Sequence, residues 1–88
     1  MASLIDMDFQ DQQGRELRPL SEQKVGYKGV IGDIVGEAIH IERLQELGFV
    51  IGEPVSIHSR TLWGEPLFVQ VRETIVALRK TEAACVLL

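Results

Sequence analysis

The feature that most constrains this chain is a glycine, Gly48, directly after an apolar stripe. Ile41, Leu44 and Leu47 recur every three residues, a spacing that puts them on one side of a helix. A residue just past a helix end often turns left-handed, and glycine does so without the steric cost of a Cβ. Phe49 can then lean back on Leu44, an apolar contact that often accompanies this helix stop. The stretch therefore predicts a short amphipathic helix that ends at a fixed turn.

The predicted helix covers residues 37–47 and is followed by a return into a strand. Gly52 and Pro54 form the corner before that strand. The apolar stripe is more typical of a helix that packs on a core than of a binding face. The opposite side of the helix would then be open to a partner, and its polar residues are Glu42, Arg43, Gln45 and Glu46.

Five short strands are predicted from β-branched content or from alternating apolar and polar residues. They cover residues 27–35, 54–60, 67–72, 74–78 and 85–88. Single helical turns are expected at 20–26, with Ser21 as the N-cap, and at 79–84. Short, tightly connected strands favour a small closed barrel, because closure removes exposed sheet edges. The predicted fold class is mainly β with inserted short helices.

Size and charge restrict the classes of function. The 88 residues suffice for one domain, whereas residues 1–19 lack periodicity and are expected to form a mobile extension. The formal net charge of −4 argues against nucleic acid as a partner, since phosphate binding needs an excess of Lys and Arg on one face. No apolar run approaches the roughly 20 residues of a membrane span. The single cysteine excludes an internal disulfide. The net charge, the absence of a long apolar run and the single cysteine together predict a soluble, cytoplasmic protein that does not insert into membranes.

Glu37 and His40 have the spacing of a metal-binding pair. The Glu-x-x-His pattern places a carboxylate and an imidazole on one helix face, as in di-iron sites. Such sites take ligands from several helices, and without a second set a surface Glu and His is the simpler interpretation. Cys85, alone in an apolar terminal strand, is interpreted as a small core residue. The sequence contains neither a nucleophile–base set nor a phosphate-binding loop, so no enzymatic activity is predicted.

Leu62 and Trp63 lie in a predicted loop beside Gly64. A loop tryptophan can be an anchor for a partner protein, because Trp is enriched among such anchors. It can equally be a lid that packs on the barrel, since a small fold has few places to bury an indole. The sequence leaves both interpretations open.

Several motifs occur together in the order found in one known family. They are Leu20-Ser21-Glu22-Gln23-Lys24-Val25-Gly26, Arg43-Leu44-Gln45-Glu46-Leu47-Gly48-Phe49 with Gly52, Gly64-Glu65-Pro66 and Ile75-Val76-Ala77-Leu78-Arg79-Lys80-Thr81-Glu82-Ala83. Over residues 20–88 this order resembles the FeoA family of bacterial ferrous iron transport proteins. The resemblance implies a cytoplasmic SH3-like barrel with an inserted helical segment, without enzymatic activity, that assists the membrane transporter FeoB. The sequence departs from the family pattern in two places. Arg72-Glu73 lacks the glycine that is usual at this hairpin, which predicts a longer or differently shaped turn. Residues 1–19 have no counterpart in the family.

Three functions remain to be distinguished. In the favoured one, a rigid barrel docks on FeoB through the Leu62–Trp63 loop and the polar side of the predicted helix, and so supports or tunes Fe(II) uptake. The second is a metal-responsive regulatory domain akin to the carboxy-terminal domain of iron-dependent repressors. The third is direct metal binding by a homo-oligomer whose subunits contribute Glu37 and His40. Docking requires no cofactor, and Fe(II) or another divalent metal is the candidate ligand of the other two functions.

Overall fold

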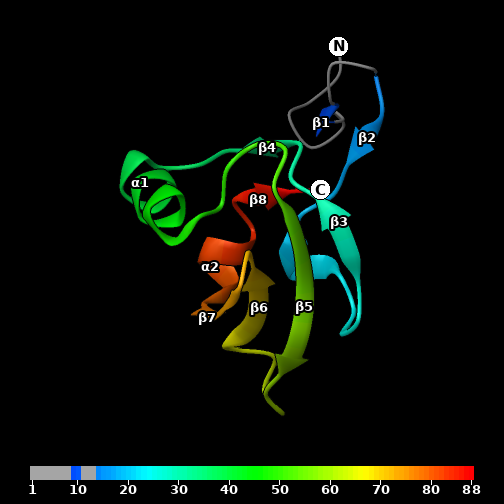
Figure 1. Cartoon of the computed structure of the whole chain (residues 1–88), viewed down its shortest axis with the longest axis vertical. Helices are drawn as coiled ribbons and strands as arrows, with labels where there is room; N and C mark the ends of the chain where they lie inside the picture. Colours follow the sequence, from blue (N-terminus) through cyan, green and yellow to red (C-terminus); the bar gives the residue numbers. More distant parts are fainter. Residues whose placement is uncertain (1–8, 11–13) are drawn as a thin grey trace.

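A four-stranded antiparallel sheet in the order β3-β5-β6-β7 forms the centre of the protein (Figure 1). The structure is a computed structural model, and it describes residues 9–10 and 14–88. The elements in chain order are β1 (Phe9–Gln10), β2 (Glu16–Leu17), the 3-10 turn η1 (Leu20–Glu22), β3 (Lys28–Val30), β4 (Asp33–Ile34), α1 (Ala38–Leu47), β5 (Pro54–Arg60), β6 (Leu67–Val71), β7 (Thr74–Leu78), α2 (Lys80–Ala83) and β8 (Val86–Leu87). The predicted mainly-β class with short helices is confirmed.

The two central strands alternate between the core and the outside, as their sequences predict. On β5, Val55 and Ile57 are buried, and on β6, Leu67, Val69 and Val71 are buried. β5 pairs with β6, and β6 pairs with β7, so the inward side chains of the three strands meet on one face. They join a single hydrophobic cluster to which α1, α2 and β8 also contribute.

The strands do not close into the barrel that the sequence predicts. β4 pairs with β8, and β1 pairs with β2, in two separate two-stranded sheets. The predicted strand 27–35 breaks at its centre, because the Ile31 N–H donates to the Glu53 carbonyl at 3.0 Å whereas the Gly32 N–H donates to the Leu87 carbonyl at 2.8 Å. The chain thereby passes from one sheet to another, and the described residues form short sheets around one core.

The helix α1 ends at Gly48 as predicted. Gly48 has φ 106° and ψ 4°, a left-handed conformation. Its N–H donates to the Gln45 carbonyl at 3.0 Å, and the Phe49 N–H donates to the Leu44 carbonyl at 2.9 Å. This pair of hydrogen bonds defines a Schellman stop. Leu44 and Phe49 are both fully buried and belong to the same hydrophobic cluster. Leu47 is only half-buried at the edge of the core.

The hairpin between β6 and β7 has a two-residue turn, so the longer turn considered above is not found. Val71 pairs with Thr74, which leaves only Arg72 and Glu73 between the strands. Arg72 adopts φ 56°, the left-handed region in which glycine is more usual. Its Nε donates to Glu53 Oε1 at 3.1 Å and so connects the turn to the corner before β5.

The turn η1 has its N-cap two residues earlier than predicted. Pro19, with φ −62°, occupies the N-cap position and no side chain caps the turn, so the predicted capping role of Ser21 is wrong. The proline ring already holds φ near the value that a helical start requires. Arg60 Nη2 donates to the Gln23 carbonyl at 2.7 Å, which connects the end of this turn to the end of β5.

The segment just before η1 belongs to the folded domain, although the sequence places it in a mobile extension. Leu17 is buried. Arg18 and Leu88 exchange two backbone hydrogen bonds, each 2.8 Å long, so this segment pairs with the carboxy-terminal strand. At positions 1–8 and 11–13 the expectation of mobility lies outside the described residues.

Candidate functional site

The loop between β5 and β6 carries the most exposed large apolar side chains of the described residues. Leu62 is 92% exposed and Trp63 is 82% exposed. In Figure 1 the loop lies beyond the arrowhead of β5 at the lower end of the sheet, away from α1. The interpretation of Trp63 as a lid on the core is therefore wrong. The loop and α1, which the sequence assigns to one docking surface, lie on separate parts of the molecule.

Hydrogen bonds brace the backbone of this loop although its tip is exposed. The Gly64 N–H donates to the Thr61 carbonyl at 3.0 Å, and the Thr61 hydroxyl donates to the Glu65 carbonyl. The Glu65 carboxylate accepts a hydrogen bond from the Lys80 N–H at the start of α2, at 3.2 Å. The loop is thus attached to the corner between β7 and α2, and it presents the two apolar side chains from a constrained backbone.

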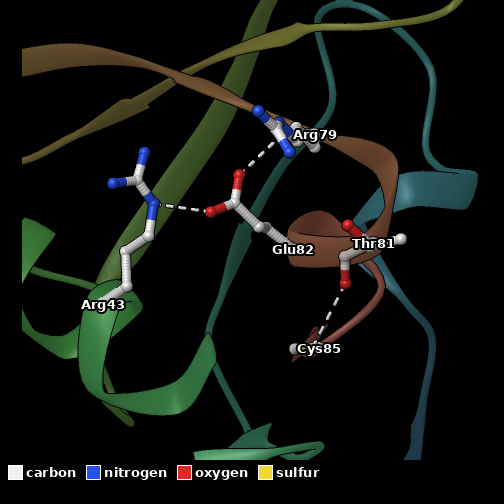
Figure 2. A network of polar contacts seen from close by, with 5 residues as sticks. All are labelled: Arg43, Arg79, Thr81, Glu82 and Cys85. Atoms are coloured by element: carbon white, nitrogen blue, oxygen red, sulfur yellow. Dashed lines mark hydrogen bonds and ion pairs between the residues drawn. The ribbon is translucent and has the colours of Figure 1, made fainter. Parts of the chain in front are cut away.

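The polar side of α1 is exposed, but one of its residues is already engaged. Glu42, Gln45 and Glu46 face solvent. The Nε of Arg43 lies 2.5 Å from Oε2 of Glu82 in α2 (Figure 2). Arg43, predicted to be available to a partner, therefore joins α1 to α2, and its side chain stays 55% exposed.

Glu82 is the buried member of this contact. Its Oε1 accepts a hydrogen bond from the Arg79 N–H at 2.9 Å (Figure 2). Burial alone would raise the pKa of Glu82, but the hydrogen bond from the Arg79 backbone and the Arg43 guanidinium together hold this pKa below its usual value. Sequence reasoning missed this role. The available signal was an acidic residue in the first turn of a short helix, where carboxylates commonly accept from free backbone N–H groups.

The structure brings Glu37 and His40 into one helical turn, and the part of the chain that it describes adds no third ligand. The helix begins at Ala38, one residue later than predicted, and Glu37 is its N-cap. His40 is half-buried, and its backbone N–H donates to the Glu37 carbonyl at 3.0 Å. Within residues 9–10 and 14–88, no three His, Cys, Asp or Glu side chains form a group that could hold a metal ion.

Cys85 is buried, as predicted for a core residue. Its thiol donates to the Thr81 carbonyl at 3.3 Å (Figure 2), and a Cβ added to Gly36 would lie 2.8 Å from its sulfur. Burial raises the pKa of the Cys85 thiol, and the carboxylates of Glu82 and Glu37 raise it further. A protonated, buried thiol is a poor nucleophile and a poor metal ligand.

A groove of about 560 Å³ opens beside β3, and the charged residues Arg15 and Glu16 are among those that line it. Its walls include Leu17, Tyr27, Val30, Ile51 and Leu88. Val30 and Ile51 are exposed there at 55% and 66%. Sequence reasoning missed the groove because its walls come from segments far apart in the chain, none of which has a distinctive pattern of its own.

The described residues thus combine an exposed apolar loop tip at Leu62 and Trp63 with a buried thiol at Cys85. The FeoA domain family model matches residues 18–88. The chain belongs to the FeoA family. This membership confirms the resemblance seen in the order of the sequence motifs, and it assigns the chain to ferrous iron transport.

Solved FeoA structures are similar to this FeoA chain. The crystal structure of Stenotrophomonas maltophilia FeoA complexed with zinc is 39% identical, with TM-score 0.68, over 77% of this chain and 85% of that one. The NMR structure of a FeoA-like protein from Clostridium acetobutylicum is 26% identical, with TM-score 0.78, over 83% of this chain and 85% of that one. The Stenotrophomonas protein is described as a prokaryotic SH3 domain protein, which confirms the SH3-like fold class.

The same fold occurs in larger proteins. A manganese-dependent transcriptional repressor is 15% identical, with TM-score 0.74, over 86% of this FeoA chain and 45% of that chain. At this low sequence identity, the similarity indicates a shared fold only.

No curated protein matches the chain. Among the residues that the structure describes, none of the helices has the length and apolar character needed to span a membrane.

Proposed function

We propose that this FeoA protein is a non-enzymatic, cytoplasmic accessory protein that docks on the cytoplasmic part of FeoB and thereby supports or tunes Fe(II) uptake. The observation that carries this proposal is the pair Leu62 and Trp63, exposed at 92% and 82% on a braced loop. Two large apolar side chains held in water are unfavourable in the free protein, and a partner pocket would remove that cost.

The exposed area of Trp63 is large enough to dominate such a contact. A Trp side chain buries about 150–250 Å². With 82% of the residue exposed, docking would remove on the order of 100–200 Å² from water, which corresponds to about 3–5 kcal/mol at ~25 cal/mol/Å². The hydrogen bonds of Thr61, Gly64 and Glu65 already order the loop, so little conformational entropy is lost on binding.

The polar side of α1 lies on a separate part of the molecule from the loop, so in this proposal it supplies a second, weaker contact with a different part of FeoB. Glu42 and Glu46 are exposed carboxylates next to the neutral Gln45. Exposed charges of this kind steer association and contribute modestly to affinity. We therefore assign most of the binding free energy to the loop and the orientation of the complex to the helix.

The test is the affinity of the full-length protein for the cytoplasmic part of FeoB. Trp63→Ala should weaken binding by about 2–4 kcal/mol, which is ~30–1,000-fold in Kd, while the melting temperature stays nearly constant. Ile75→Ala is a matched control, because Ile75 is an exposed β7 side chain at 48% and pairs with Gln70, away from the end of β5 where the loop begins. Unchanged affinity of Trp63→Ala would contradict the proposal, as would an equal loss in the Ile75→Ala control.

A cellular measurement tests whether the loop is needed for iron transport. Iron uptake is measured in cells that lack this protein and are complemented with the wild type, Trp63→Ala or Ile75→Ala, with FeoB levels held equal. We expect uptake with Trp63→Ala to match that of cells without the protein. Wild-type uptake with this variant would refute a role of the loop in transport.

A further inference from the structure

We propose that two copies of this chain pair through the free edge of β3, as an antiparallel β3–β3 contact about a two-fold axis at Gly29. β3 is an end strand of the four-stranded sheet and lies at the margin of the fold in Figure 1. An end strand presents unpaired backbone groups that can accept another strand. A dimer of this kind is independent of docking on FeoB.

Alternate residues of β3 turn their backbone groups away from the sheet. The Ile31 N–H donates to the Glu53 carbonyl of the neighbouring chain segment at 3.0 Å, and by the two-residue period of a strand Gly29 faces the same way. Lys28 and Val30 therefore point their N–H and C=O groups outward. Among the described residues, none of these groups has a backbone hydrogen-bond partner.

One register satisfies the outward groups of both copies. With Lys28 opposite Val30 of the second copy, each pair exchanges two hydrogen bonds and Gly29 faces Gly29 on the axis. A register with Lys28 opposite Lys28 would place like charges side by side, which is unfavourable. A register with Val30 opposite Val30 would place Lys28 opposite Gly32, whose N–H already donates to the Leu87 carbonyl at 2.8 Å.

Tyr27 and Gly29 fit the centre of this contact. A Cβ added to Gly29 would lie 2.9 Å from Cε1 of Tyr27, so the ring covers the glycine. In a non-hydrogen-bonded antiparallel pair the two glycine Cα atoms lie about 4.5 Å apart. The two Tyr27 rings then come side by side, within the range of about 4.5–7 Å in which aromatic rings attract each other.

The side chains beside this edge are those that a second copy would cover. Val30 is 55% exposed, Ile51 is 66% exposed and Tyr27 is 36% exposed, and all three line the groove next to β3. So few residues bury less than the ~800 Å² per partner that a stable complex needs, which makes the dimer weak and dependent on concentration. The symmetric pairing uses the edge of both copies, so it stops at two.

The experiment is sedimentation equilibrium of the full-length protein up to ~1 mM, a range that suits an interface of this size. Amide NMR shifts are followed over the same concentrations. We expect a dimer and concentration-dependent shifts at the amides of Lys28 and Val30. Val30→Pro removes one N–H from each copy and should lower the association constant by ~10–100-fold. Because an outward N–H at an edge is dispensable for folding, the variant should keep the native far-UV spectrum.

A second variant keeps the proposal testable if the proline disturbs the strand. Val30→Lys retains an exposed position and sets a charge opposite Lys28 of the second copy, so association should fall by about 10-fold. The matched control is Ile75→Lys on β7, the opposite end strand, where Ile75 is 48% exposed. A monomer at every concentration would overturn the proposal. So would a dimer that Val30→Lys weakens no more than Ile75→Lys does.

Discussion

Replacing Gly48 tests whether the left-handed stop of α1 contributes to stability. Its φ of 106° and ψ of 4° lie in the region that residues with a Cβ avoid. A Cβ added at this position would make only ordinary contacts, 3.6 Å from Arg72 Cδ and 3.7 Å from Val71 Cγ2. The cost of Gly48→Ala therefore comes from backbone conformation and not from a clash.

The magnitude follows from that conformation. We expect Gly48→Ala to lower the free energy of unfolding by ~1–2 kcal/mol, the cost of a left-handed conformation for an L-residue. Gly48→Asn should cost less, because Asn adopts this conformation more readily. Gly52→Ala is the matched control, since Gly52 has φ 91° and no atom within 4 Å of an added Cβ, and it should cost about as much as Gly48→Ala. Gly36→Ala should cost more, because at φ 120° its Cβ would lie 2.8 Å from the buried Cys85 sulfur.

Thermal and urea unfolding followed by far-UV circular dichroism measure these differences. For a domain of this size, 1 kcal/mol shifts the melting temperature by roughly 4–8 °C, so Gly48→Ala should melt about 4–16 °C below the wild type. Unchanged stability of Gly48→Ala would refute the reasoning. An Asn variant as unstable as the Ala variant would show that a contact of the side chain, and not the backbone, sets the cost.

Three further predictions concern α1 and its contacts. Leu44→Ala should lower the free energy of unfolding by about 2–5 kcal/mol, because Leu44 is fully buried. Leu47→Ala should lower it by less, because Leu47 is half-buried. Equal losses of the two variants in urea titrations would contradict this difference in burial. Because its contacts lower the pKa of Glu82, the stability that they contribute is present above the ordinary value of 4.5 and is lost as the pH falls through the lowered pKa. Arg43→Ala should therefore reduce the acid-induced loss of melting temperature, and an unchanged pH profile would contradict the linkage. In equilibrium dialysis, we expect the wild type and His40→Ala to bind the same amount of Fe(II). Stoichiometric Fe(II) binding by the wild type that is lost in His40→Ala would favour direct metal binding.

Local signals predict local structure well in this chain. The end of α1 was predictable because the stripe through Leu44 and the stop at Gly48 lie within a few residues of each other. The strands β5 and β6 were predictable because one buried face imposes an alternating pattern on each of them. In each case the sequence pattern and the structure that it specifies occupy the same short segment.

Structure that depends on distant segments escaped prediction. Barrel closure depends on how Ile31 and Gly32 divide their hydrogen bonds between two sheets, and no local pattern records this division. The contact of Arg43 with Glu82 joins residues 39 positions apart, so the sequence shows two ordinary surface charges. The sequence identified Trp63 as a candidate residue but did not predict its exposure, because a tryptophan in a loop suits a lid and an anchor equally well.

The register of β3 on β5 keeps the two proposed surfaces apart. Lys28 pairs with Ser56 near the start of β5, whereas the Trp63 loop follows Arg60 at its end. Four residues at about 3.3 Å each separate the two points by about 13 Å along the strand. A dimer formed through β3 would therefore leave both loops open to FeoB. We expect Val30→Lys to bind the cytoplasmic part of FeoB with wild-type affinity per protomer, and Trp63→Ala to sediment like the wild type. Loss of both properties in either variant would mean that the two surfaces are one.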